Sequence, residues 1–214
     1  MRKLVTSGIF ASAAAAAVIA LSAPPAFAAT WEVTNGGDLS AIAGVTTLVV
    51  HNAAGDVTLA CSSADATASV PNGQSDGLPV GQITSLNFND CLLGGAIPFE
   101  VATNAIASPW DLNALSQSGD VVTGAIPTGI SARVTGTVVP CDIVVSGPAN
   151  ANDGSVPATY DNAAHQLIVD GGGNLTLHNV DPGECADLLD NGDSAEFSGN
   201  FDVDPPAEIN LIAP

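Results

Sequence analysis

The stretch Ser-Ala-Glu-Phe-Ser-Gly-Asn-Phe-Asp-Val-Asp, residues 194–204, decides the predicted fold of this chain. Its apolar residues and its glycine occupy every second position, and the positions between them are polar or acidic. A β-strand directs successive side chains to opposite faces, so the stretch predicts a strand with one buried face and one acidic, solvated face. Gly199, in the middle, indicates a bulge or a position where another backbone or side chain comes close.

A second stretch follows the same design. Residues 131–138 repeat the order Ser-Ala-charged-apolar-hydroxyl-Gly-polar-apolar that residues 194–201 show. The repetition predicts two related halves, roughly residues 56–139 and 140–204, within one domain that spans residues 29–214.

The rest of the chain contains short apolar runs separated by turn residues, and no window predicts an amphipathic helix of normal length. The sequence therefore predicts an all-β fold, an antiparallel sandwich or barrel, with at most one short helical turn near Cys185. Residues 71–79 are predicted to form a loop because proline, glycine and polar residues dominate them. The expected strands cover residues 31–34, 45–51, 57–61, 82–88, 99–103, 110–115, 121–125, 130–139, 143–146, 166–169, 175–180 and 194–204.

Residues 1–28 have the three parts of a secretory signal peptide. Arg2 and Lys3 supply the positive start, residues 9–21 are apolar, and Ala26-Phe27-Ala28 matches the small-x-small pattern that precedes cleavage. An uncleaved membrane anchor is the alternative, but the apolar run is short for a span and Pro24-Pro25 end it. We expect cleavage before Ala29, secretion, and no membrane insertion afterwards.

Cleavage would leave a strongly acidic protein. Arg133 is the only Lys or Arg beyond residue 28, against 22 acidic residues, which gives a formal net charge of −21. Nucleic acids and anionic membranes would repel such a chain, since binding them requires Lys and Arg. The expected partner is an unknown extracellular or cell-envelope ligand.

Four cysteines, an even number in a chain with an export signal, predict disulfides. Three pairings are possible. We favour Cys61–Cys91 with Cys141–Cys185 because each predicted half then has its own crosslink. A tetrahedral zinc site is disfavoured, since the paired short cysteine spacings of such sites are missing.

Several segments together resemble a family of secreted Thr/Gly/Ala-rich proteins of actinobacteria. The resemblance implies a secreted location and this type of fold. It implies no catalytic residue, because the family has no assigned activity. The segments that carry it are the signal peptide and residues 31–34, 82–91, 109–114 and 191–203.

Two patterns suggest catalysis only weakly. Residues 73–77 match the Gly-x-Ser-x-Gly pattern around a nucleophilic serine, here Ser75, but that chemistry needs a sharp turn between a strand and a helix, and no helix is predicted here. The three histidines, His51, His165 and His178, have no metal-ligand spacing. Surface or hydrogen-bonded roles are the more usual ones for such histidines.

The acidic segment 181–208 suggests a calcium site. Calcium prefers several carboxylate and carbonyl oxygens from an irregular loop. A solvated acidic surface is the favoured alternative. The residues that could bind calcium are Asp187, Asp190, Asn191 and Asp193.

Trp110 is the candidate for binding a ligand, because an exposed tryptophan can stack on a sugar ring, although burial in the core is the more usual fate. The leading hypothesis is a secreted, non-enzymatic binding or structural module with no cofactor other than possible calcium. Exposure of Trp110 would favour that reading. An apolar interior cavity of several hundred Å³ would favour the alternative, a carrier of a small apolar ligand inside a barrel. A serine hydrolase is the least favoured reading.

Overall fold

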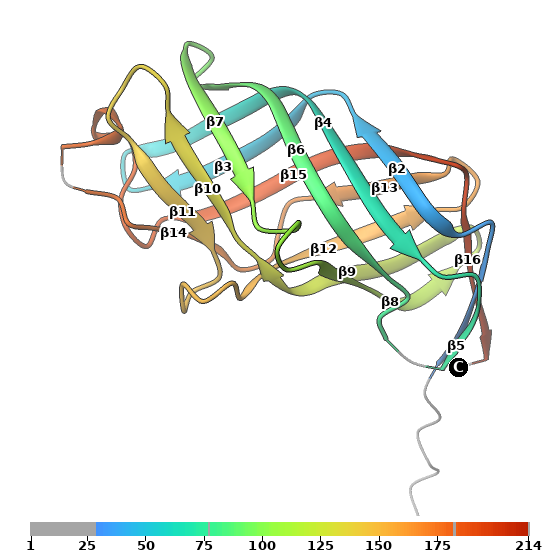
Figure 1. The fold of residues 1–214 in the computed structure, drawn as a ribbon. Helices are drawn as coiled ribbons and strands as arrows, with labels where there is room; N and C mark the ends of the chain where they lie inside the picture. Colours follow the sequence, from blue (N-terminus) through green and yellow to red (C-terminus); the bar gives the residue numbers. More distant parts are fainter. Residues whose placement is uncertain (1–28, 77, 182, 214) are drawn as a thin grey trace, which may run out of the picture.

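The computed structural model describes residues 29–76, 78–181 and 183–213, and these residues form an all-β protein (Figure 1). The predicted signal peptide, residues 1–28, lies outside the described residues. One 3-10 turn, η1 (Cys185–Asp187), interrupts the strands near the cysteine where a helical turn was expected. The strands are β1 (Thr30–Thr34), β2 (Gly37–Ala43), β3 (Thr46–Asn52), β4 (Gly55–Val70), β5 (Gly73–Asp76), β6 (Gly81–Leu93), β7 (Ile97–Thr103), β8 (Trp110–Ser118), β9 (Val121–Ile130), β10 (Ala132–Gly136), β11 (Asp142–Ser146), β12 (Gly154–Asp161), β13 (Gln166–Asp170), β14 (Leu175–His178), β15 (Ser194–Asp204) and β16 (Glu208–Ala213).

The large sheet closes on itself. Its antiparallel pairings run from β13 through β12, β9, β8, β6, β4, β2 and β15, and β15 pairs again with β13. A second closed circuit runs through β6, β7, β10, β11, β14, β15, β3 and β4. The long strands β4, β6 and β15 belong to both circuits. Of the two expected arrangements, the barrel therefore describes the large sheet.

Both circuits are parts of one eight-stranded barrel whose strands follow chain order. β4, β6 and β15 run through both parts, and the other five strands are interrupted midway. Each interrupted strand is a collinear pair that faces the same neighbours, namely β2 with β3, β7 with β8, β9 with β10, β11 with β12, and β13 with β14. The two proposed halves, residues 56–139 and 140–204, share this single barrel, and their repetition stays a prediction.

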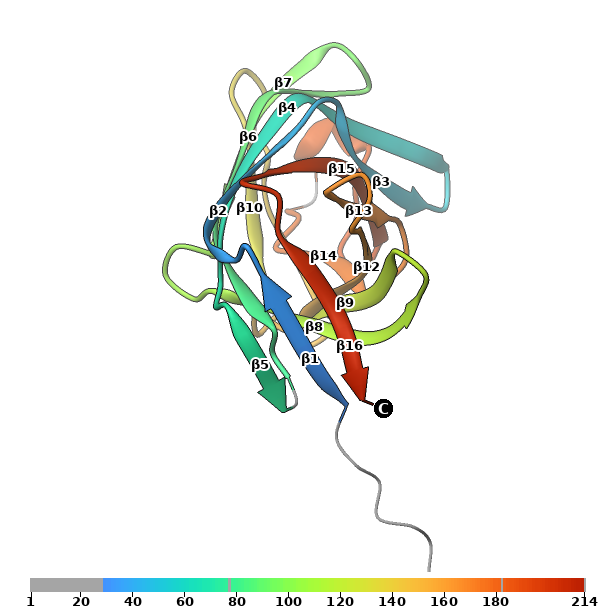
Figure 2. The ribbon, with the colours of Figure 1, turned by 90° about the vertical axis from the view of Figure 1, so that its right-hand side faces the viewer.

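A small three-stranded sheet, β16-β1-β5, covers one end of the barrel, and we call it the flap (Figure 2). Its order reproduces that of three adjacent barrel strands, β15-β2-β4, and each flap strand follows or precedes one of them in the chain. The chain bends at Pro205-Pro206, at Asn35-Gly36 and at Pro71-Asn72. The flap is thus the continuation of one barrel wall, folded over the barrel's end.

Strand alternation directs the apolar side chains inward. In β15, Ala195, Gly199 and Phe201 are buried and Glu196, Asn200 and Asp202 are exposed, which confirms the alternation predicted for this stretch. One large cluster of buried residues fills the barrel. Two smaller clusters, centred on Trp31 and Val33 of β1, join the flap to the barrel end.

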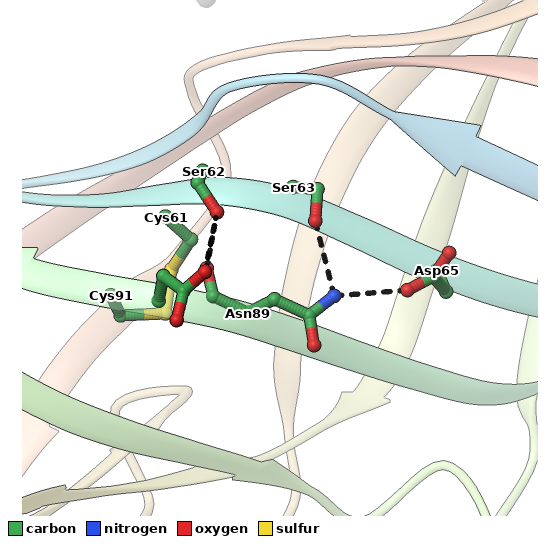
Figure 3. The surroundings of a disulfide bond; sticks show 7 residues. Cys61, Ser62, Ser63, Asp65, Asn89 and Cys91 are labelled. Atoms are coloured by element: carbon green, nitrogen blue, oxygen red, sulfur yellow. Dashed lines mark hydrogen bonds between the residues drawn. A yellow bond between two sulfur atoms is a disulfide. The ribbon is translucent and has the colours of Figure 1, made fainter.

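The predicted disulfides are both present and confirm the favoured pairing. Cys61 and Cys91 lie directly opposite each other on β4 and β6, with their Cα atoms 3.9 Å apart (Figure 3). Beside them on the outer face, the Asn89 amide donates to Ser63 Oγ at 3.1 Å and to Asp65 Oδ2 at 2.9 Å. Cys141, after β10, joins Cys185 in η1.

The expected strands are incomplete in two respects. β2, β12 and β16 were not predicted at all, and β4 and β6 extend well beyond the expected runs. The segment predicted as a loop, residues 71–79, contains β5, which pairs with β1. Its polar residues form a strand because the flap supplies a pairing edge, which local composition does not reveal.

Candidate ligand cavity

An apolar cavity of about 170 Å³ lies inside the barrel. All eight strands of the barrel, with each interrupted pair counted as one, contribute to its lining. The lining contains no aspartate, glutamate, histidine, lysine or arginine among the described residues. Residues that form its wall include Ile83, Leu86, Ile126, Val156, Phe201 and Trp110. A molecule in this space would meet hydrocarbon side chains almost everywhere.

Two of the four polar residues of the lining, Thr103 and Tyr160, are already hydrogen-bonded to the backbone, and the other two are Asn113 and Thr159. Thr103 Oγ1 donates to the Leu86 carbonyl at 2.9 Å, and the Tyr160 hydroxyl donates to the Ala207 carbonyl at 2.7 Å. Burial, followed by the nearby charges of Glu208 and Asp161, raises the pKa of Tyr160 to about 12. The phenol therefore stays neutral at physiological pH. The hydroxyl hydrogens of both Thr103 and Tyr160 are already donated to backbone carbonyls.

Trp110 lies in the wall of this cavity and is not displayed on the surface. Its side chain is 3 % exposed, and its Nε1 donates to Asn104 Oδ1 at 2.9 Å. Asn104 is itself fixed, because its amide donates to the Gly129 carbonyl at 3.0 Å. Trp110 is therefore buried, the more usual fate of a tryptophan, and the structure does not support stacking on a sugar at the surface. Trp110 lies beside the cavity instead.

The structure does not gather the residues suggested for calcium. The Asn191 side chain bonds both the N–H and the carbonyl of Val180, at 2.9 and 2.6 Å. Asp193 Oδ2 accepts the Asp190 N–H at 2.8 Å. Within the described ranges no three Asp, Glu, His or Cys side chains are placed to hold a metal ion. The side chains of Asn191 and Asp193 thus stabilise the local turns. The geometry does not support the prediction of calcium at Asp187, Asp190, Asn191 and Asp193.

Ser75 lies on β5, opposite Trp31 of β1. The nucleophile pattern requires a tight turn from a strand into a helix, which presents the serine hydroxyl beside backbone donors. Ser75 instead occupies an extended strand of the flap. The local geometry that would activate the serine is thus replaced by strand pairing.

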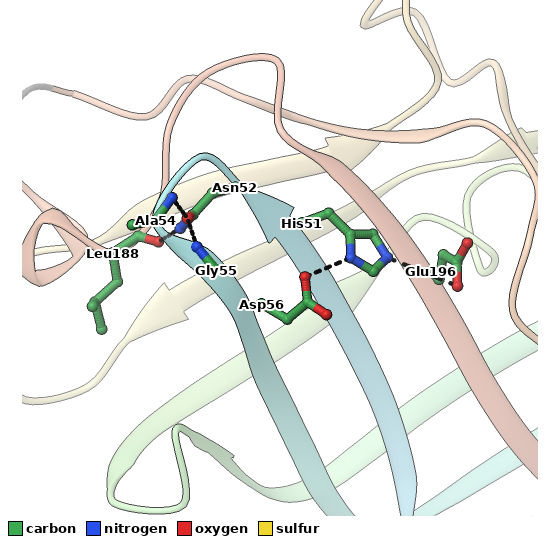
Figure 4. Close-up of polar contacts among 7 residues, drawn as sticks. All are labelled: His51, Asn52, Ala54, Gly55, Asp56, Leu188 and Glu196. Atoms are coloured by element: carbon green, nitrogen blue, oxygen red, sulfur yellow. Dashed lines mark hydrogen bonds and ion pairs between the residues drawn. The ribbon is translucent and has the colours of Figure 1, made fainter.

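A polar cluster that the sequence did not reveal surrounds His51 (Figure 4). His51 Nδ1 lies 2.8 Å from Asp56 Oδ1, and its Nε2 lies 3.8 Å from Glu196 Oε2. The three residues come from β3, β4 and β15, and strand register brings them together. His51 pairs with Asp56, and Glu196 pairs with Val49, which lies two positions before His51 on the same strand. The hydrogen bond that the protonated His51 ring donates to Asp56, opposed by partial desolvation, raises the pKa of His51. Because the two ring nitrogens face different carboxylates, the protonated His51 forms ion pairs that link three strands.

The other two histidines stand apart from this cluster. His178 Nε2 lies 2.9 Å from the Gly147 carbonyl. His165, in the turn between β12 and β13, has a buried Nδ1 without a hydrogen-bond partner.

Comparisons of the chain with protein-family models, with curated proteins and with solved structures give no match. Within the described residues, no helix has the length and apolar character needed to cross a membrane.

Proposed function

We propose that this protein is a secreted, non-enzymatic binding protein that holds a small apolar molecule inside its barrel. The cavity carries the proposal, because apolar side chains line it and it offers a ligand neither a charge nor a general acid or base. The two disulfides suit an oxidising, extracellular setting.

The size of the barrel supports a small occupant. Eight strands leave an interior that side chains can fill or that one small ligand can occupy. An apolar cavity of about 150 Å³ is large enough to bind benzene, whereas drug-sized ligands need about 300–1,000 Å³. The cavity here, at about 170 Å³, is smaller than the several hundred Å³ expected of a carrier and fits a molecule close to a monocyclic hydrocarbon in size.

The alternative of a binding module that uses exposed Trp110 loses its main support, since Trp110 faces the interior. The same burial makes Trp110 a reporter of the cavity. The chain has two tryptophans, so in a Trp31→Phe variant all tryptophan fluorescence comes from Trp110.

Bromobenzene is a suitable probe, because its heavy atom quenches a neighbouring indole. We expect saturable quenching of Trp110 in the oxidised Trp31→Phe protein. Ala158 lines the cavity, and Ala158→Leu should fill part of it and weaken binding by at least about tenfold. Ala54→Leu adds the same atoms to an exposed turn and should leave binding unchanged. Absence of saturable quenching in the folded protein would overturn the proposal.

A further inference from the structure

The two ends of the barrel are closed in different ways. At the end that contains η1, Val180, Cys185 and Leu189 are buried in the core cluster. The Cys141–Cys185 disulfide fixes this segment covalently, and Asn52 Nδ2 donates to the Leu188 carbonyl at 2.6 Å. The opposite end is closed by the flap, which neither disulfide joins to the barrel. The chain connects the flap to the barrel at the three bends and where β5 leads into β6.

The flap reaches the cavity directly. Ala207, next to β16, and Ile209 of β16 belong to the cavity lining, together with Val70, Val80 and Tyr160 at the end of the barrel. Displacement of the flap would therefore uncover the cavity. Opening the barrel at the η1 end would first require breakage of the Cys141–Cys185 disulfide.

One side of the flap is a bend where its strands continue into the barrel. The three bends fall at prolines or at Asn-Gly pairs, and Asn72 joins two of them. Gly36 N–H donates to Asn72 Oδ1 at 2.7 Å, and Asn72 Nδ2 donates to the Gly36 carbonyl at 3.1 Å. At the row of three bends the chain itself connects each flap strand to a barrel strand, so this row has the position of a hinge.

One edge of the flap, the strand β16, is held by three side chains of the opposite barrel wall. Asn162 Nδ2 donates to the Ile209 carbonyl at 2.8 Å, and Asn162 Oδ1 accepts the Ile209 N–H at 2.9 Å. Gln117 Oε1 accepts the Leu211 N–H at 2.6 Å. The Tyr160 hydroxyl completes the set on the Ala207 carbonyl. We call Gln117, Tyr160 and Asn162 the latch.

The latch replaces a strand ladder. Among the strand pairs of the described residues, none joins a flap strand to a barrel strand. The amide groups of Asn162 and Gln117 instead imitate a neighbouring strand along the edge of β16. A few side-chain hydrogen bonds and an apolar seam can open locally, whereas a closed barrel wall opens only with global unfolding.

We propose that the flap is the gate of the cavity, which turns about the bend and releases the latch to admit and discharge the apolar ligand. This inference rests on the proposed function. Opening would separate Trp31, which is fully buried in the seam, from Val80, Ala114 and Val122. The gate therefore has its own reporter, distinct from Trp110.

The test compares latch variants by two readouts. Gln117→Ala with Asn162→Ala should raise the rates of bromobenzene entry and release, followed by stopped-flow quenching of Trp110, by about tenfold or more. The same double variant in a Trp110→Phe background should let acrylamide quench Trp31 more readily. Asn89→Ala, which removes an amide with two hydrogen bonds on the outer barrel wall, is the matched control and should change neither readout.

The outcomes separate the gate from the ligand proposal. Quenching of Trp110 with unchanged rates in the latch variants would overturn the gate and leave the cavity function intact. No saturable quenching of Trp110 in the Trp31→Phe protein with an intact latch would overturn the cavity function. In that case acrylamide quenching of Trp31 still tests whether the flap opens. Quenching that is unchanged in the latch variants would contradict an opening flap. Circular dichroism and melting of each variant establish that it is folded, and Gln117→Ala alone provides a milder variant.

Discussion

Gly199 of β15 lies against the side chain of Thr46 of β3, so closely that a Cβ atom at position 199 would stand 2.9 Å from Thr46 Cγ2. The contact occurs where β15 exchanges one neighbour for another. Ser198 still pairs with Thr47 of β3, whereas Phe201 already pairs with Ala43 of β2. The close approach that the mid-strand glycine predicted is thus explained by the interruption between β2 and β3.

Gly199→Ala is expected to destabilise the protein by about 1–3 kcal/mol, because the new methyl group overpacks a buried site. Urea unfolding measures the change. Thr46→Ser removes the opposing methyl group, so Gly199→Ala should be less damaging in that background. Equal effects in both backgrounds would show that the contact is not the cause.

The hydroxyl of Thr46 is a second feature of this site. The residue is 1 % exposed, and its Oγ1 is buried without a hydrogen-bond partner. A buried polar atom without a partner lowers stability by about 1–3 kcal/mol.

Thr46→Val should therefore raise the free energy of unfolding by about 1 kcal/mol, since it keeps the branched shape and removes the orphaned hydroxyl. Thr46→Ser, which keeps the hydroxyl and loses the methyl group, should lower it. Thermal and urea unfolding of the two variants test the pair, and a destabilised Thr46→Val would contradict the assignment.

The sequence pattern predicted those parts of the fold that depend on residues close together in the chain. The alternation of residues 194–204 gave the bounds of β15 and its buried face, and the loss of alternation near Cys185 marked η1. The disulfides followed from the arrangement of cysteines along the chain. Each of these features depends on residues close in sequence or on a simple pairing rule.

The features that sequence reasoning missed depend on distant neighbours. A proline disfavours a central strand because it cannot donate a backbone hydrogen bond, yet Pro157 lies in β12. The proline is tolerated because β13 pairs only with residues 159–161 of β12, and Pro157 lies beside Gly172 instead. The flap exists only because three barrel strands end side by side. The chemistry of Trp110 made it a candidate for ligand binding. Whether its side chain faces the interior or the surface depends on the closure of the barrel.

The two disulfides should each contribute about 3–4 kcal/mol to stability through the entropy of loop closure in the unfolded chain. The cysteines are 30 and 44 residues apart, a difference too small to separate the two effects by this mechanism. Replacement of either pair by alanines should lower the free energy of unfolding by a similar amount. Alkylation of the native protein without reductant should label no cysteine, and labelled thiols would contradict both crosslinks.

The His51 cluster should make stability depend on pH. The pKa of His51 is raised by the Asp56 hydrogen bond and by the charges of Asp56 and Glu196, so the folded protein holds the proton more tightly than the unfolded chain does. The stabilisation is complete below the unfolded pKa of about 6.5 and disappears as the pH rises through the folded pKa. At still lower pH it is lost when the carboxylates become protonated.

His51→Gln should therefore destabilise the protein more at pH 5.5 than at pH 8, as measured by urea unfolding of both proteins at each pH. Comparison with the native protein at the same pH cancels the general repulsion among the many carboxylates. In an Asp56→Asn background, which removes the main cause of the shift, the difference between the two pH values should shrink. A difference that persists there, or one that grows toward pH 8, would show that the pairing of His51 with Asp56 does not stabilise the joint between β3, β4 and β15.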